Sequence, residues 1–120
     1  MMEGGWTANS ASPRPRYHVG YEGMFLFKRD GRYYLCCAEN FEGRCSCTVA
    51  MATHLFGPYG ARYEALPHAG YNMIFQDGHG QWWSTYFGSD GLARWRERAG
   101  VFPVEFDAAG RVWPKTIDRP

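Results

Sequence analysis

The sequence lacks the features that mark membrane and nucleic-acid-binding proteins. None of its apolar runs approaches the ~20 residues that a membrane-spanning helix needs. Its net charge is only +1, from 13 Lys and Arg against 12 Asp and Glu, so no charge excess attracts nucleic acid or an anionic membrane. Residues 1–16 contain no apolar stretch of the kind that a signal peptide requires. No phosphate-binding loop, dinucleotide fingerprint or ordered Ser/His/Asp set appears either, which excludes the common nucleotide and serine-hydrolase chemistries.

The composition is that of one packed domain. The chain has 120 residues, of which 45% are hydrophobic and 18% aromatic. The hydrophobic content is enough for a core and gives no disorder signature. Aromatic side chains in this proportion suit β-strands and sugar-binding surfaces alike.

A short unit consisting of an aromatic strand, an Asp/Gly turn and a second strand is repeated along the chain. The first copy covers residues 25–35, the second covers 73–84, and a third, shorter copy covers 104–113. Tyr33-Tyr34 of the first copy becomes Trp82-Trp83 in the second, 49 residues later. A period of roughly 40–50 residues built on hairpins is typical of β-propeller blades.

The pattern predicts an all-β fold made of about two and a half antiparallel, four-stranded blades. A complete propeller would need roughly 160–250 residues, so we expect part of one, with exposed strand edges and blade faces. We expect a partial propeller domain at 21–114, a loose tail at 1–20 and a second tail at 115–120. A loop is expected at 39–43, and 92–98 fits either a strand or a helical turn. The expected strands are 23–28, 32–38, 44–53 and 61–66, followed by a strand that starts at 71, a strand at 82–87, and a terminal hairpin of 102–107 with 111–113.

Glu22 is the candidate catalytic residue. It lies at the start of a blade's first strand, and in a propeller these strands line the central channel, with their starts around one mouth. A carboxyl flanked there by aromatic residues would be partly desolvated, which favours the protonated form that a general acid needs. The alternative is an ordinary surface carboxylate in a loop.

Four segments in order resemble five-bladed propeller glycosidases of glycoside hydrolase family 43 and its relatives. Residues 22–35 resemble the family's E-G/A-P…G-x-Y-Y-L stretch, and 49–59 resemble its v-a-x-S…l-x-G-P-y stretch. Residues 70–83 resemble its G-H-N…F-x-D-x-x-G-x-W-W stretch, and 103–111 resemble its closing hairpin. The resemblance covers about residues 21–114.

The resemblance implies a fragment of a glycoside hydrolase that cleaves arabinose-, xylose- or galactose-type linkages in plant or algal polysaccharides. In the family, the Glu that matches Glu22 is the general acid, and an Asp of an earlier blade activates water on the opposite side of the sugar. This inverting arrangement needs two carboxyl groups about 6.5–9.5 Å apart. The resemblance also implies an exported protein, extracellular or periplasmic.

The chain departs from the family pattern at the base and at a metal-linked position. Asp30, Asp77 and Asp107 fall in equivalent hairpin turns, where Asp is a turn former, while Asp90 falls in a loop and Asp118 in the tail. We therefore expect no base Asp in this chain and little activity from it alone. Tyr71 replaces a His that, in many members, approaches a central metal or water site. We therefore expect no cofactor and no metal.

Tyr71 and Asn72 are the candidate substrate-binding residues. Aligning Phe75 on Phe27 places both beside Glu22 at the same mouth. There the Tyr could stack on a sugar and the Asn could bond a hydroxyl. The alternative is that both side chains only fill the channel.

The four cysteines do not have the spacing of a zinc site. Cys36 and Cys37 point to opposite faces of their strand, whereas Cys45 and Cys47 share a face, so four thiolates could not easily converge. We expect buried free thiols, with a cross-strand contact between the two pairs.

A second function class stays open beside the glycosidase. Half-propellers could associate through their open edges, or with a missing N-terminal half, to form a non-catalytic carbohydrate-binding or interaction module. The partner expected in either case is a carbohydrate, with no nucleic acid and no membrane.

Overall fold

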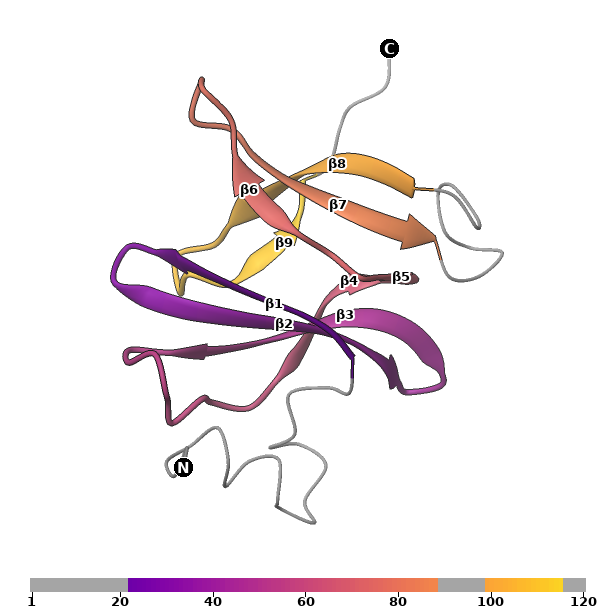
Figure 1. Ribbon diagram of the computed structural model, residues 1–120, viewed down its shortest axis with the longest axis horizontal. Helices are drawn as coiled ribbons and strands as arrows, with labels where there is room; N and C mark the ends of the chain where they lie inside the picture. The colour runs from indigo at the N-terminus through magenta and orange to yellow at the C-terminus, as the bar shows by residue number, and fades with distance from the viewer. Residues whose placement is uncertain (1–21, 89–98, 116–120) are drawn as a thin grey trace.

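The computed structural model describes residues 22–88 and 99–115 (Figure 1). These residues form strands and no helix, which confirms the all-β prediction, and they therefore include no helix that could cross a membrane. The predictions for 1–20, 92–98 and 116–120 lie outside the described residues. The strands are β1 (Glu22–Arg29), β2 (Arg32–Phe41), β3 (Arg44–Ala52), β4 (Tyr63–Pro67), β5 (Ala69–Gly70), β6 (Ile74–Gln76), β7 (Trp82–Gly88), β8 (Ala99–Phe106) and β9 (Val112–Pro114).

The first sheet is an antiparallel meander in the order β1-β2-β3-β4, as predicted for one blade. The loop expected at 39–43 is wrong, because β2 continues to Phe41, which pairs with Arg44. Only the Glu42-Gly43 turn separates the two strands. The extension follows from Glu39, whose carboxylate is buried against Arg62 and so holds this end of β2 in the sheet.

The second sheet contains the remaining strands, in the order β5-β7-β8-β9 with β6 also paired to β7. The predicted terminal hairpin is present as β8 and β9. It continues the second sheet, because β8 pairs with β7 from Trp83↔Pro103 to Phe87↔Ala99. The described residues thus form two sheets that lie one against the other (Figure 1).

The inner strand of each sheet, which is β1 in the first sheet and β5 with β6 in the second, is interrupted at the same place. In β1 the register with β2 shifts between Glu22 and Phe25, and Gly23 in the gap has φ 62°. In the second sheet, the gap between β5 and β6 plays the same part, and Tyr71 in that gap has φ 56°. Left-handed backbone is easy for Gly and unusual for a bulky residue such as Tyr. The sequence repeat therefore extends to a repeated bulge.

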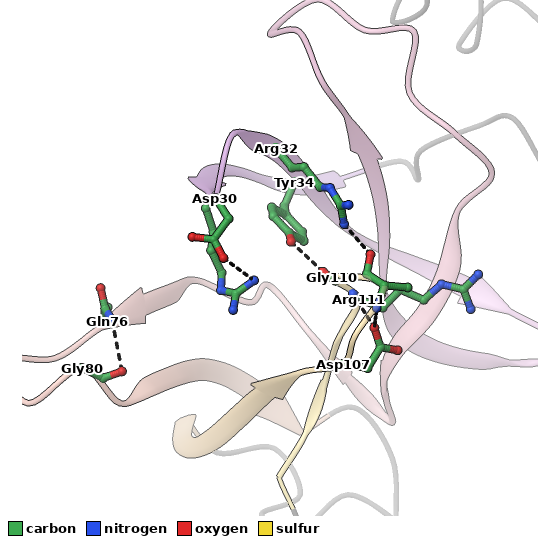
Figure 2. Close-up of polar contacts among 10 residues, drawn as sticks. Asp30, Arg32, Tyr34, Gln76, Gly80, Asp107, Gly110 and Arg111 are labelled. Carbon is green, nitrogen blue, oxygen red and sulfur yellow. Dashed lines mark hydrogen bonds and ion pairs between the residues drawn. The ribbon is translucent and has the colours of Figure 1, made fainter.

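An aromatic cluster joins the two sheets. Phe27 of β1 stacks on Tyr34 of β2 with ring centroids 4.5 Å apart. From the second sheet, Trp82 and Phe106 approach Phe27 at 5.7 and 6.3 Å. The Tyr34 hydroxyl donates a hydrogen bond of 2.6 Å to the Gly110 carbonyl, which ties the first sheet to the β8–β9 turn (Figure 2).

The turns that precede β7 and β9 have one hydrogen-bonding pattern. Asp77 accepts from the Trp83 indole N–H at 2.8 Å, and Asp107 accepts from that of Trp113 at 2.8 Å. The other carboxylate oxygen of each Asp accepts two backbone N–H groups of its own turn. These bonds hold the pKa of both carboxyls below the usual range, with the Trp bond as the largest cause.

Candidate functional site

Glu22 opens the inner strand of the first sheet, as predicted. It pairs with Ala38 just before the bulge, at the end of β1 opposite the Asp30-Gly31 turn. The structure differs from the prediction in one respect, because the residue is exposed rather than partly desolvated. Within the described residues, its carboxylate can therefore meet a ligand without any rearrangement.

Tyr71 lies across the bulge from Glu22. Its hydroxyl hydrogen-bonds the Glu22 carboxylate, and this bond is the main reason why the pKa of the Tyr71 phenol is raised. Its ring lies against Gly23, where an added Cβ would come within 2.7 Å of the ring carbon Cδ1. The predicted neighbourhood of Glu22 and Tyr71 is thus present. Since Tyr71 is 50% exposed, its outer side stays open to a ligand.

Asn72 is held within the second sheet. It is only 2% exposed, and its side-chain NH₂ donates to the Ser84 hydroxyl and to the Thr85 carbonyl, both at 3.0 Å. These bonds fasten the interrupted inner strand to β7. The other amide atom, Oδ1, is buried and has no hydrogen-bond partner among the described residues. The Asn72 NH₂ group therefore holds the interrupted strand against β7, while the Oδ1 atom makes no hydrogen bond within the described residues.

The cysteines are free thiols. Cys36 and Cys47 are buried together, and the hydrogen bond between their side chains raises the pKa of Cys36, followed by burial. Burial also raises the pKa of Cys37 to about 12. The expected cross-strand contact is confirmed, and the described residues contain no cluster of three or more His, Cys, Asp or Glu side chains that could hold a metal.

A buried ion pair near the same end of the first sheet escaped sequence reasoning. The Glu39 carboxylate accepts from Arg62 Nε and from the Thr48 hydroxyl, both at 2.5 Å, and its Oε2 atom has no partner among the described residues. The sequence does indicate a strand here, because Cys37, Glu39 and Phe41 are two residues apart, as residues on one face of a β-strand are. Reading this stretch as a loop hid that alternation.

The opposite end of the sheets is a polar rim. Arg32 donates to the Ala109 carbonyl, and Arg29 pairs with Asp30 at 3.4 Å (Figure 2). A notch of about 220 Å³ lies between the Asp30 and Asp107 turns. Since each of these arginines already has a protein partner, we interpret this rim as a structural contact that holds the two sheets together.

Several solved structures to which this chain is similar are glycoside hydrolases. The chain superposes on the family 43 protein BlXynB of Bacillus licheniformis with a TM-score of 0.61 and 28% identity, covering 78% of this chain and 21% of that one. An exo-1,5-α-L-arabinanase from a bovine ruminal metagenomic library gives a TM-score of 0.66 at 18% identity, with 79% and 38% covered. The Cellvibrio cellulosa α-L-arabinanase complexed with arabinohexaose gives 0.66 at 13% identity, with 78% and 36% covered.

The fold is therefore that of a partial β-propeller, and the propeller is of the kind found in family 43 glycoside hydrolases. The predicted resemblance to that family is confirmed at the level of the fold. The chain spans between about a fifth and two fifths of the length of these structures. No family model and no curated protein matches the sequence.

Proposed function

We propose that this chain is the acid-bearing part of a glycoside hydrolase, with Glu22 as the general acid. The observation that carries the proposal is the position of Glu22, exposed at the start of an inner strand and hydrogen-bonded by Tyr71 from the equivalent bulge of the next sheet. The fold match to a family 43 protein and to two arabinanases supports the same reading. The proposed substrates are arabinose-, xylose- or galactose-type polysaccharides.

In the proposed reaction, protonated Glu22 gives its proton to the departing glycosidic oxygen. Water attacks the anomeric carbon from the opposite side, so that the configuration inverts. Tyr71 fixes the direction of the carboxyl through its hydroxyl and offers the free side of its ring to a sugar. Asn72 supports this arrangement by holding the interrupted strand against β7.

The base that activates water would come from blades outside the described residues. Asp77 and Asp107 are fully engaged by their own turns and adjacent Trp residues, so neither is available. Asp30 pairs with Arg29 at the opposite rim. Asp90 and Asp118 lie outside the described residues. We therefore expect this chain alone to hydrolyse glycosides very poorly.

The proposal is tested in a complete propeller, formed by co-expressing this chain with the blades of the ruminal arabinanase that it does not match. Glu22→Gln should lower turnover of arabino- and xylo-oligosaccharides by roughly 10²–10⁴-fold, the usual contribution of general acid catalysis. Its oligosaccharide Kd should change little, because Gln keeps the shape of the side chain and an oxygen that accepts a hydrogen bond. Wild-type turnover by this variant would refute the assignment.

A non-catalytic carbohydrate-binding or interaction module is the second candidate. It is favoured by the large exposed apolar side chains on both sheets, which include Met24 and Phe75. Such a module should bind oligosaccharide without hydrolysing it in any assembly, and Glu22→Gln should be silent in every assay.

A further inference from the structure

The two sheets repeat one pattern of side chains on each face. Phe27 of β1 pairs with Tyr34 of β2, and Phe75 of β6 pairs with Trp83 of β7, the residue that matches Tyr34 in the sequence repeat. Phe75 therefore occupies the position of Phe27, and Ile74 occupies that of Leu26. We call the face that carries Phe27 or Phe75 face A, and the face that carries Leu26 or Ile74 face B. Alternate residues of a strand point to opposite faces, so each sheet has one face of each kind.

The contact inside the chain joins face A of the first sheet to face B of the second. Phe27 meets Trp82, with ring centroids 5.7 Å apart, and Ile74 is buried in the same cluster as Tyr34. Contact of this kind leaves Ile74 only 2% exposed. The molecule therefore contains one complete example of how face A packs on face B.

Within the part of the chain that the structure describes, no strand covers the other two faces. On face B of the first sheet, Leu26 is 40% exposed, although its counterpart Ile74 is buried. Leu26 lines a hollow of about 290 Å³ with Leu55 and Phe56, which are also exposed. The side chains that line this hollow are almost all apolar, so covering it with another apolar surface is favourable.

Face A of the second sheet is uncovered in the same way. Phe75 is 42% exposed, whereas Phe27, its counterpart in the covered face, is half-buried and packed in the core cluster. Met73 and Val101 on this face are 55% and 47% exposed. Their positions follow from the register, in which Val101 pairs with Thr85 and the Thr85 N–H donates to the Met73 carbonyl.

We propose that the free chain covers these faces with copies of itself, face A of the second sheet in one copy packing on face B of the first sheet in the next. The second copy is the occupant that the structure itself supplies, because each open face has the strand positions of a face that is already packed inside the chain, Phe75 matching Phe27 and Leu26 matching Ile74. Such a contact is head-to-tail. It closes into a ring if the rotation between copies allows, and otherwise extends as a filament.

The inference rests on the two faces and not on the glycosidase reaction. A charge placed on one face should abolish only the contacts that this face makes. Leu26→Asp damages face B of the first sheet and leaves face A of the second intact, and Phe75→Asp does the reverse. Both side chains are at least 40% exposed, so the folded chain tolerates the charge.

The test measures molar mass by sedimentation velocity over a range of concentrations, with circular dichroism to check folding. The wild-type chain should associate, and each single variant should stay monomeric, with association weakened about 30-fold or more, as for a central interface residue. An equimolar mixture of the two variants should form a 1:1 dimer, because each supplies the face that the other lacks. Ala108→Asp, in an exposed turn outside both faces, should associate as the wild type does.

Two results would overturn the proposal. One is a mixture that stays monomeric while both variants are folded, which would mean that the intact faces do not fit each other. The other is a single variant that associates as strongly as the wild type, which would place the contact elsewhere. The mixing result remains decisive even if the wild-type chain forms long filaments.

Discussion

The Tyr71 hydroxyl hydrogen-bonds the Glu22 carboxylate across the two interrupted inner strands. The contact exists because both strands bulge at the same position, which brings the Tyr71 ring over Gly23. An unusual left-handed backbone at a bulky residue is tolerated where the surrounding structure holds it, and such positions gather at functional sites. Here the outcome is a carboxyl group that lies within reach of the Tyr71 hydroxyl.

Removing the Glu22 charge should lower the pKa of Tyr71 toward its usual value. The hydrogen bond from the neutral phenol and the nearby negative charge both oppose loss of the Tyr71 proton, so Glu22→Gln weakens both effects. The measurement is a pH titration of tyrosine ring carbons by NMR, with Tyr71→Phe to assign the signal. Tyr63, whose pKa is raised mainly by burial, should titrate identically in both proteins.

Gly23→Ala should destabilise the chain more than Gly31→Ala. Both glycines have positive φ, 62° and 76°, so each Ala costs about 1–2 kcal/mol of backbone strain. At Gly31 an added Cβ meets nothing within 4 Å, whereas at Gly23 it meets the Tyr71 ring at 2.7 Å. The extra cost should be about 1–3 kcal/mol in urea unfolding. Equal costs would show that Tyr71 does not press on Gly23.

Tyr34→Phe should cost about 1–2 kcal/mol of unfolding free energy. The substitution keeps the stacked ring but leaves the buried Gly110 carbonyl without its 2.6 Å hydrogen bond. Tyr33→Phe, on the opposite face of β2, is the matched control and should cost less than about 0.5 kcal/mol. Equal effects of the two substitutions in urea unfolding would argue against the brace between the first sheet and the β8–β9 turn.

The Asp77 and Asp107 turns should lose their stabilising effect in acid. Their pKa values are lowered in the folded chain, so the stabilisation is complete above the unfolded carboxyl pKa of about 3.9 and is lost as the pH falls through the folded values. Asp77→Asn should therefore lower the melting temperature at pH 7 and have a much smaller effect near pH 2. A constant difference between wild type and variant over this range would contradict the role of the ionised carboxylate.

The sequence predicted the fold where local chemistry repeats. The Asp/Gly turns and the aromatic pairs Tyr33-Tyr34 and Trp82-Trp83 were enough to identify hairpins, because turn residues and alternating aromatics have short-range causes. The end of β2 was missed, since the buried Glu39 carboxylate is paired with Arg62, which lies 23 residues further along the chain. Pairing of this kind depends on the assembled sheet.

The candidate site was predicted in its composition but only partly in its geometry. The alignment of Phe75 on Phe27 correctly brought Tyr71 next to Glu22. It could not reveal that the NH₂ group of Asn72 turns into the sheet toward Ser84, because this depends on a break in the strand that the residue types do not specify. Nor could it show that Glu22 is exposed, which depends on what packs around the mouth.

The most direct test of Glu22 as general acid compares two leaving groups in the complete propeller described above. Glu22→Gln should lower kcat/KM roughly 10²–10⁴-fold on an arabino-oligosaccharide, whose leaving group needs a proton. On a dinitrophenyl arabinoside, whose dinitrophenolate leaving group departs without protonation, Glu22→Gln should change kcat/KM little. Equal losses on both substrates, or no loss on the oligosaccharide, would contradict the assignment.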